Sequence, residues 1–141
     1  MTREWKILLA EDSADDRLLI ARALKSLKTV TLIHTLEDGQ EVIEYLGGQS
    51  PYGDREKFPV PDLILLDLKM PRANGFEVLE WIRNFNGVKP LVVVLSSSEV
   101  PDEEKRALLL GAKLYLVKSY NMVETLRPLV PFLAKASEEA P

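Results

Sequence analysis

Short apolar runs alternate along this chain with longer segments in which apolar residues recur every three or four positions. The runs predict buried strands, and the periodic segments predict amphipathic helices. The predicted strands cover residues 6–10, 30–34, 63–66, 91–95 and 112–117. Strands that alternate with helices in this order favour an α/β fold, a doubly wound parallel sheet with helices on both faces. The polar alternation of residues 30–34 is typical of a strand at the sheet edge.

Capping residues and prolines mark where the helices begin and end. The predicted helices start at or just after Ser13, Asp38-Gly39, Asn74-Gly75, Pro101 and Asn121. Two prolines, at positions 128 and 131, lie inside the apolar pattern of the last helix. An interior proline removes a backbone hydrogen bond and clashes with the preceding turn, so we expect a break near Arg127. Residues 49–61 are rich in proline, glycine and charge and predict a long surface loop.

The bulk composition narrows the class of protein. A chain of 141 residues favours one domain, which we expect to span residues 1–135, with 136–141 as a disordered tail. The net charge of −4 argues against nucleic acid as a partner, and the lack of cysteine excludes disulfides and thiol chemistry. No apolar run approaches the roughly 20 residues of a membrane span. We therefore expect a cytoplasmic protein with no membrane partner.

Polar residues stand directly after four of the predicted strands. Glu11 and Asp12 follow the first strand, Asp67 the third, Ser96 the fourth and Lys118 the fifth. The carboxyl ends of parallel strands lie at one edge of the sheet, where ligands bind in such folds. We therefore expect three carboxylates, a hydroxyl and an ammonium group to meet there. This combination indicates a phosphoryl-transfer site with a metal ion.

The carboxylates indicate which metal the site would take. Three carboxylates at short range raise one another's pKa or require a counter-ion. A hard divalent cation with oxygen ligands fits better than zinc, because no cysteine exists and His34 belongs to the edge strand. Acidic pairs after strands also serve as helix caps, which is the competing interpretation of Glu11 and Asp12. It fits Asp67 poorly, because the Lys-Met-Pro text at 69–71 cannot begin a helix.

Several motifs together resemble the response-regulator receiver domain of two-component signalling. The matching text is ILLAED at 7–12, LILLDLKMP at 63–71, NG at 74–75, VVVLSS at 92–97, GA at 111–112 and YLVK at 115–118. The resemblance covers nearly all of the chain. It implies a flavodoxin-like sheet of five strands in the order 2-1-3-4-5.

The resemblance also implies roles for the polar residues at the sheet edge. Asp67 corresponds to the phosphoacceptor. Asp12, Asp67 and the backbone carbonyl of Lys69 correspond to the ligands of Mg²⁺ (magnesium), and Glu11 to a ligand that acts through water. Lys118 corresponds to the lysine that binds the phosphoryl group.

Two further residues correspond to the family's switch. Ser96 matches the switch hydroxyl and Tyr115 the switch aromatic residue. Each has a plainer interpretation from sequence: Ser96 as a helix cap, since two serines follow it, and Tyr115 as a packing residue of the last strand. Both interpretations stay open at this stage.

The implied function is that of a stand-alone response regulator phosphorylated by a sensor histidine kinase. The long loop at 49–61 and the PDLILLDL text at 61–68 resemble regulators that serve phytochrome-type kinases. Such a protein is a phosphoacceptor with slow self-dephosphorylation, not a conventional enzyme, and its output passes to another protein. We also expect part of the apolar triple at 18–20 to be exposed as a kinase docking patch, and a homodimer through the remodelled face or the C-terminal segment.

Two positions depart from the family pattern. Ser119 follows Lys118 where the family usually has proline, often after a cis bond, and cis before serine costs about 2.5–4 kcal/mol. The bond is therefore either strained or trans. Lys69 stands two residues after Asp67, where smaller groups are frequent. Its long side chain predicts a comparatively long-lived phosphorylated state.

Two other functions fit parts of the pattern. A magnesium-dependent aspartyl phosphohydrolase uses the same groups, but it usually carries a second acid two residues after the nucleophile, where this chain has Lys69. A module of the same fold that acts without phosphorylation is the other alternative. The intact acids argue against it, whereas Ser119 leaves it open.

Overall fold

The computed structural model describes residues 3–139, which form one parallel sheet with helices on both faces. The strands are β1 (Trp5–Ala10), β2 (Val30–Leu36), β3 (Leu63–Leu66), β4 (Leu91–Ser96) and β5 (Leu114–Val117). They lie in the order β2-β1-β3-β4-β5, as the family resemblance implies. The predicted edge position of β2 is confirmed.

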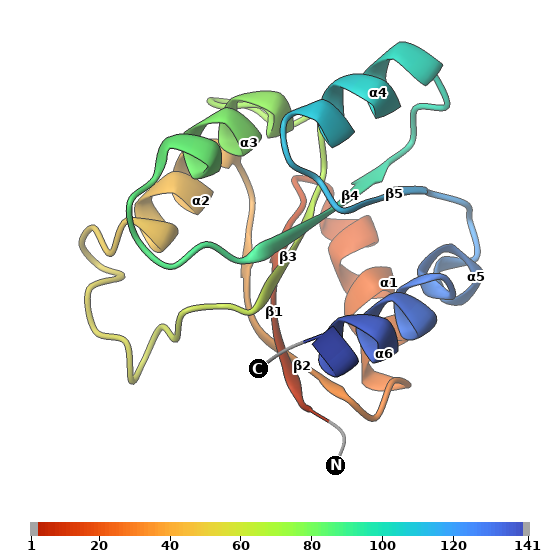
Figure 1. Ribbon diagram of the computed structural model, residues 1–141, viewed down its shortest axis with the longest axis horizontal. Helices are drawn as coiled ribbons and strands as arrows, with labels where there is room; N and C mark the ends of the chain where they lie inside the picture. Colours follow the sequence, from red (N-terminus) through yellow and green to blue (C-terminus); the bar gives the residue numbers. More distant parts are fainter. Residues whose placement is uncertain (1–2, 140–141) are drawn as a thin grey trace.

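Within residues 3–139, six helices cover the sheet in two layers (Figure 1). They are α1 (Ala14–Lys25), α2 (Gly39–Leu46), α3 (Gly75–Asn84), α4 (Pro101–Leu109), α5 (Met122–Leu126) and α6 (Leu129–Glu139). Helices α2, α3 and α4 lie over one face, and α1, α5 and α6 lie over the other. The predicted break near Arg127 is confirmed, because this residue caps α5 and α6 begins two residues later.

The prediction of a disordered tail from residue 136 is wrong for residues 136–139, which continue α6. Ala136 packs against the core, and Trp5 Nε1 donates a hydrogen bond to Ser137 Oγ at 3.1 Å. The scarcity of large apolar residues hid the end of this helix from the sequence pattern. Residues 140 and 141 lie outside the described part of the chain.

The register of the central strands places the predicted site. All four residues of β3 are fully buried, as expected for a strand covered on both faces. Ala10 of β1 pairs with Leu66 of β3, so the residues that follow them, Glu11 and Asp67, emerge side by side. Residues 3–139 contain no helix long and apolar enough to cross a membrane.

Candidate functional site

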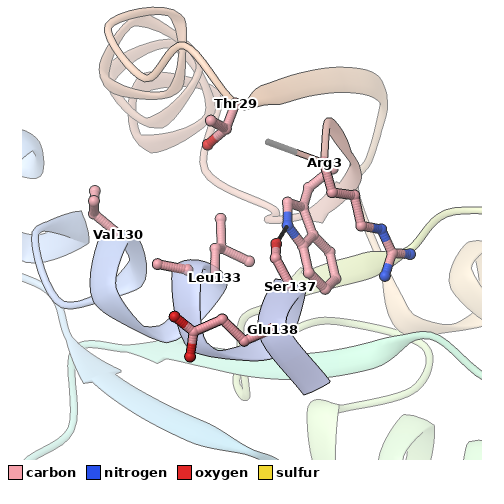
Figure 2. A pocket seen from close by; sticks show the side chains of 8 residues that line it. Arg3, Thr29, Val130, Leu133, Ser137 and Glu138 are labelled. Atoms are coloured by element: carbon pink, nitrogen blue, oxygen red, sulfur yellow. Dashed lines mark hydrogen bonds between the residues drawn. The ribbon is translucent and has the colours of Figure 1, made fainter. Parts of the chain in front are cut away.

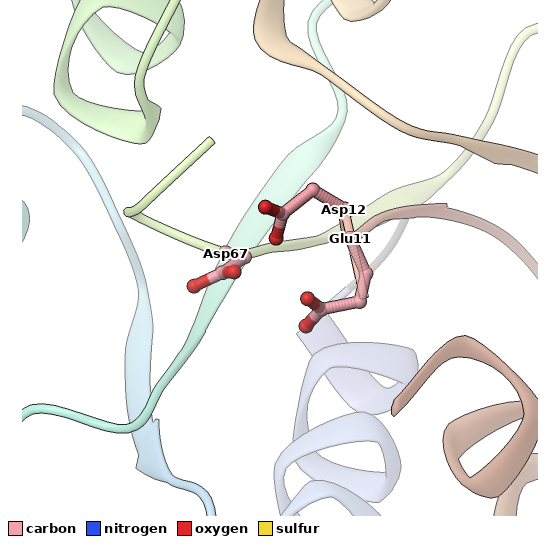
Figure 3. Close-up of side chains that lie close together, drawn as sticks. All are labelled: Glu11, Asp12 and Asp67. Carbon is pink, nitrogen blue, oxygen red and sulfur yellow. The ribbon is translucent and has the colours of Figure 1, made fainter. Parts of the chain in front are cut away.

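Three carboxylates meet at the carboxyl end of the sheet, as the sequence predicts (Figure 3). Glu11, Asp12 and Asp67 each offer a carboxylate oxygen, and these oxygens lie within 4.8 Å of one another. Glu11 is 1% exposed and Asp67 is 6% exposed, whereas Asp12 is open to solvent. The cluster therefore combines two buried carboxylates with an accessible one at its mouth.

The acidic pair does not cap a helix. The N-cap of α1 is Ser13, whose side chain accepts a hydrogen bond from the backbone N–H of Asp16 at 3.2 Å. Glu11 instead accepts the N–H of Ser13 at Oε2, at 3.2 Å. The capping interpretation of Glu11 and Asp12 is therefore wrong.

Backbone hydrogen bonds and one arginine hold the acidic loop in place. The N–H of Asp67 donates to the carbonyl of Ala10 at 3.1 Å, which ties the ends of β3 and β1 together. Arg17, in the second turn of α1, donates to the carbonyls of Glu11 at 2.8 Å and Asp12 at 3.1 Å. Arg17 was not expected at the site, and only its position a few residues after the acidic pair hinted at this role.

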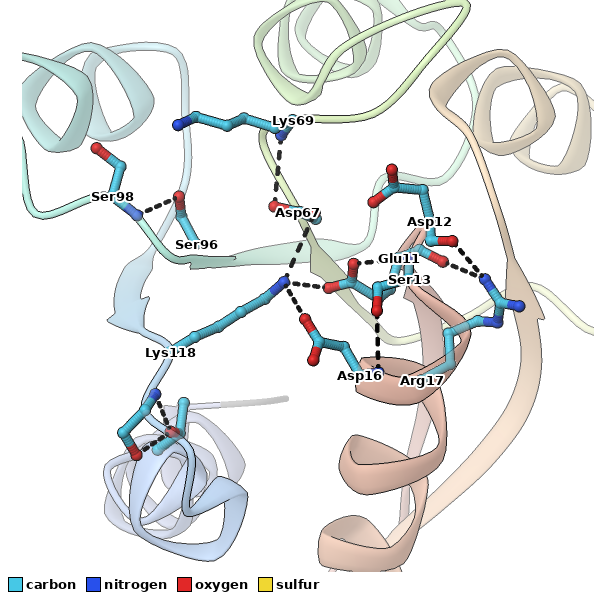
Figure 4. Close-up of polar contacts among 12 residues, drawn as sticks. Glu11, Asp12, Ser13, Asp16, Arg17, Asp67, Lys69, Ser96, Ser98 and Lys118 are labelled. Carbon is cyan, nitrogen blue, oxygen red and sulfur yellow. Dashed lines mark hydrogen bonds and ion pairs between the residues drawn. The ribbon is translucent and has the colours of Figure 1, made fainter.

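Lys118 reaches the carboxylates from the end of β5 (Figure 4). Its Nζ lies 2.5 Å from Glu11 Oε1, 3.0 Å from Asp16 Oδ2 and 3.7 Å from Asp67 Oδ2. Its side chain is only 11% exposed, so the ion pairs are shielded from water. The sequence placed Asp16 only in the first turn of a helix, and its contact with Lys118 depends on how α1 packs.

Burial and mutual charge shift the ionisation of the cluster. Burial raises the pKa of Glu11 to about 7, and the charge of Asp67 adds to this while Lys118 opposes it. Burial also raises the pKa of Asp67, against the opposing charge of Lys118. Burial alone would lower the pKa of Lys118, but its contacts with Glu11 and Asp67 outweigh that effect and raise it. The site thus holds more negative charge than its lysine neutralises.

The donor set fits a hard divalent cation. Glu11 Oε1 is buried and makes no well-aligned hydrogen bond within residues 3–139, although Lys118 lies close to it. The three acids supply oxygen ligands only, which suits magnesium-like ions rather than zinc. Lys69 donates its N–H to Asp67 Oδ1 at 3.4 Å and exposes its side chain. A metal contact through the Lys69 carbonyl stays a prediction.

The two predicted switch residues each hydrogen-bond to Ser98, which lies in the loop after β4. Ser96 is fully buried, and its Oγ accepts the N–H of Ser98 at 3.1 Å. Tyr115 packs against the core, and its hydroxyl donates to the carbonyl of Ser98 at 2.9 Å. Ser96 does not cap α4, because the N-cap of that helix is Val100. Ser98, which the sequence analysis mentioned only as a neighbour, connects both residues.

The bond between Lys118 and Ser119 is trans. Within residues 3–139 the one cis bond precedes Pro51. The sequence left a strained cis bond and a trans bond as alternatives, and the structure has the second. Lys118 nevertheless reaches the carboxylates, so proline at position 119 is not required to direct it there.

Two other regions contribute nothing to this site. His34 packs against Tyr45, with ring centroids 5.8 Å apart, and the loop at 49–61 adds Tyr52 and Phe58 to the same aromatic cluster. A largely apolar cavity of about 450 Å³ lies at the opposite end of the sheet, between the start of β1 and α6 (Figure 2). None of the predicted site residues lines it.

Comparisons with known proteins agree with the geometry. The sequence matches the family model of the response regulator receiver domain over residues 7–129. It is 38% identical over 117 residues to the response regulator Rcp1 of Synechocystis sp., and the match covers 82% of this chain and 78% of Rcp1. The Regulator of RpoS of Escherichia coli is 34% identical over 125 residues, which are 89% of this chain but only 33% of that protein.

Solved structures show the same fold. The phosphorylated cyanobacterial phytochrome response regulator RcpA superposes with a TM-score of 0.80 and 32% identity, over 98% of this chain and 97% of RcpA. The Mn²⁺-bound form of Rcp1 has a TM-score of 0.76 and 32% identity, over 97% of each chain. A relative with a bound divalent cation and a phosphorylated relative thus share this architecture.

Proposed function

Because this chain belongs to the response regulator receiver domain family, we propose that Asp67 accepts a phosphoryl group from a sensor histidine kinase. The observation that carries the proposal is the convergence of buried Asp67 with Glu11, Asp12 and Lys118 at one edge of the sheet. Three separate segments supply these groups, and packing alone does not require so much buried charge. The protein then acts as a phosphoacceptor rather than as a conventional enzyme.

The transfer moves one phosphoryl group between two side chains. A carboxylate oxygen of Asp67 attacks the phosphorus of a phosphohistidine, the P–N bond breaks, and the imidazole nitrogen takes up a proton as it leaves. The product is an acyl phosphate on Asp67. Lys118 Nζ, already 3.7 Å from Asp67 Oδ2, pairs with a phosphoryl oxygen and balances the added charge.

We propose Mg²⁺ as the physiological cation. It would be held by Asp12, Asp67, the Lys69 carbonyl and, through water, Glu11, and would neutralise charge on the transferring phosphoryl oxygens. The support is the oxygen-only donor set and the Mn²⁺-bound form of the relative Rcp1.

The contacts of Ser96 suggest how phosphorylation changes the surface. A phosphoryl oxygen on Asp67 accepts a hydrogen bond from the Ser96 hydroxyl and draws it away from the Ser98 N–H, which that hydroxyl oxygen now accepts. Movement of Ser96 releases Ser98, whose carbonyl holds the Tyr115 hydroxyl. The loop before α4 and the side chain of Tyr115 then rearrange together, which remodels the face formed by α4, β5 and α5. Such a local charge change acting on a two-state element is typical of phosphorylation switches.

We place the kinase at the groove between α1 and α5. Leu18 and Leu19 are about half exposed, as the sequence analysis expected, and Val123 of α5 exposes an apolar side chain beside Leu19. Ile20 of the same triple is buried. The similarity to Rcp1 and RcpA favours a phytochrome-type kinase, which works from cytoplasmic ATP, so we place this protein in the cytoplasm. Dimerisation through the α4–β5–α5 face belongs to the same proposal.

The phosphohydrolase alternative lacks its leaving-group acid. Position 69, where such enzymes usually place that acid, holds a lysine with an exposed side chain. The phosphorylation-independent module is also disfavoured, because the trans bond at Ser119 leaves Lys118 directed into the carboxylate cluster.

Labelling with a small phosphodonor tests the proposal. Wild type, Asp67→Asn and Asp62→Asn are incubated with acetyl phosphate and Mg²⁺, and covalent phosphate is measured. Asp62 is the matched control, because it directly precedes β3 as Asp67 directly follows it. We expect labelling of wild type and Asp62→Asn and none of Asp67→Asn. Equal labelling of all three proteins would overturn the assignment of Asp67.

A further inference from the structure

The residue after Lys118 is fastened to α5 by a small hydrogen-bond network. The backbone N–H of Ser119 donates to Thr125 Oγ1 at 2.9 Å, and Ser119 Oγ donates to the carbonyl of Asn121 at 2.8 Å. Thr125 Oγ1 also lies 3.1 Å from that carbonyl and 2.9 Å from Ser119 Oγ. The hydroxyls of Ser119 and Thr125 each have one proton to donate, whichever of these oxygen contacts they make. A hydroxyl oxygen also has two lone pairs, so Thr125 Oγ1 can accept the Ser119 N–H in every arrangement of the protons.

The backbone before Lys118 is fastened to a different element. The N–H of Lys118 donates to the carbonyl of Ser96, the last residue of β4, at 2.8 Å. The two peptide planes that flank the Lys118 Cα are therefore held by β4 on one side and by α5 on the other. Peptide units are planar, so fixing both planes fixes the direction of the Lys118 Cα–Cβ bond.

That direction decides where the ammonium group can reach. The lysine side chain is long and rich in rotamers, so a rotated backbone would allow its charge to leave the site for water. With the backbone as it stands, Nζ lies within 4 Å of carboxylate oxygens of Glu11, Asp16 and Asp67. The aim of Lys118 thus depends on the hydrogen bond one residue later.

We infer that Thr125 is a positioning residue for phosphoryl transfer, and that its hydroxyl oxygen holds the backbone at Ser119 so that Lys118 points into the carboxylate cluster. This inference rests on the proposed role of Asp67 and Lys118. Thr125 touches none of the reacting groups and acts only through Lys118. Its side chain is nearly buried in α5, which makes it a firm anchor, whereas Ser119 itself is exposed.

Because Ser119 is exposed, an effect of Thr125 on the position of Lys118 can be distinguished from an effect on folding. When Thr125 is replaced by valine, water can satisfy the freed N–H of Ser119, so no buried donor is left unpaired there. Valine keeps the branched shape of threonine and loses the hydroxyl. The expected defect of Thr125→Val is therefore misalignment of Lys118.

The test measures the rate of labelling by acetyl phosphate as a function of Mg²⁺. Thr125→Val should lower the rate constant at saturating Mg²⁺ by about tenfold or more, because small misplacements of a reacting group cost up to about 100-fold. The Mg²⁺ concentration that gives half the maximal rate should stay the same, since no acid is altered. Thr125→Ser retains the hydroxyl and should restore the rate, and Thr29→Val, at the opposite end of the sheet, is the matched control.

A double-mutant cycle shows whether Thr125 acts through Lys118. In a Lys118→Ala background, Thr125→Val should cause no further loss, because the group it positions is gone. An equal loss in both backgrounds, or a wild-type rate in Thr125→Val, would overturn the inference. If Thr125→Val fails to fold, amide exchange of the wild type decides. The Ser119 N–H should exchange much more slowly than that of fully exposed Tyr120, and equal rates would overturn the inference.

These outcomes differ from failure of the proposed function. Equal labelling of wild type and Asp67→Asn would remove the phosphoacceptor itself. Labelling that depends on Asp67 and is unaffected by Thr125→Val would remove only the positioning role.

Discussion

Strand β3 has an aspartate at each end, and the two aspartates lie in different environments. Asp62 precedes the strand, is partly exposed, and accepts hydrogen bonds from Arg3 Nη2 at 3.0 Å and from the N–H of Lys6 at 2.8 Å. Asp67 follows the strand, is 6% exposed, and shares its surroundings with Glu11. One carboxylate is paired near water, and the other is buried beside a like charge.

Strand β5 likewise has a lysine at each end, and the two lysines lie in different environments. Lys113 precedes it and is exposed, whereas Lys118 follows it and places its ammonium group among three carboxylates. At both ends of the sheet, an aspartate flanks β3 and a lysine flanks β5. At the carboxyl end, the charged side chains are buried and converge on one place. Burying charge costs stability, so proteins usually keep such clusters only at functional sites.

The largest effect should come from Lys118, with Lys113 as its control. Lys118→Ala removes the cation that balances the phosphoryl group, and we expect the labelling rate with acetyl phosphate to fall by about 100- to 1000-fold, as when one transition-state donor is removed. Lys113→Ala, at the opposite end of β5, should leave the rate unchanged. Equal effects of the two substitutions would show that the ends of the sheet do not differ as proposed.

The stability of the metal-free protein should fall as pH rises through the weakly acidic range. The folded state raises the pKa of Glu11 from 4.5 to about 7, so it binds this proton more tightly than the unfolded state does. The free energy of unfolding should therefore decrease between pH 4.5 and about 7 and level off above that, by up to about 3 kcal/mol for Glu11. Urea titrations at several pH values measure this slope.

Glu11→Gln isolates the contribution of the cluster. It should flatten the slope, whereas Asp62→Asn should leave it in place, because Asp62 lies outside the cluster. A slope that Glu11→Gln does not alter would show that Glu11 ionises normally in the folded protein.

The smallest effect should come from Asp62→Asn. The Arg3–Asp62 ion pair is partly exposed, and such pairs contribute about 1 kcal/mol or less. The midpoint of urea unfolding should shift only slightly in this variant. A large loss of stability would mean that the Asp62 carboxylate contributes far more than a partly exposed ion pair does, and that the amino end of the sheet depends on a buried charge pair.

The same comparison shows what could be predicted from the sequence. The apolar runs predicted the strands, and the parallel order predicted that residues after the strands, not those before them, would meet. Asp67 and Lys118 were thereby placed together without coordinates, whereas Lys113 fell inside the predicted last strand, which begins at Leu114 in the structure. This inference needed only the chain direction and the period of the pattern.

Contacts that depend on helix packing could not be predicted in this way. Asp16, Arg17 and Thr125 reach the site region because α1 and α5 lie against the sheet at particular angles, which no local pattern specifies. The end of α6 was missed for a different reason. Its small and charged residues resemble a disordered tail until Trp5 supplies a partner for Ser137.

Locating the acyl phosphate tests the central claim most directly. Borohydride reduces an acyl phosphate on aspartate to homoserine, and it leaves phosphate esters and free carboxylates intact. After acetyl phosphate treatment and reduction, peptide mass spectrometry should find homoserine at residue 67 and unmodified aspartate at residue 62. Homoserine at another acid, or a covalent phosphate that resists borohydride, would contradict the account.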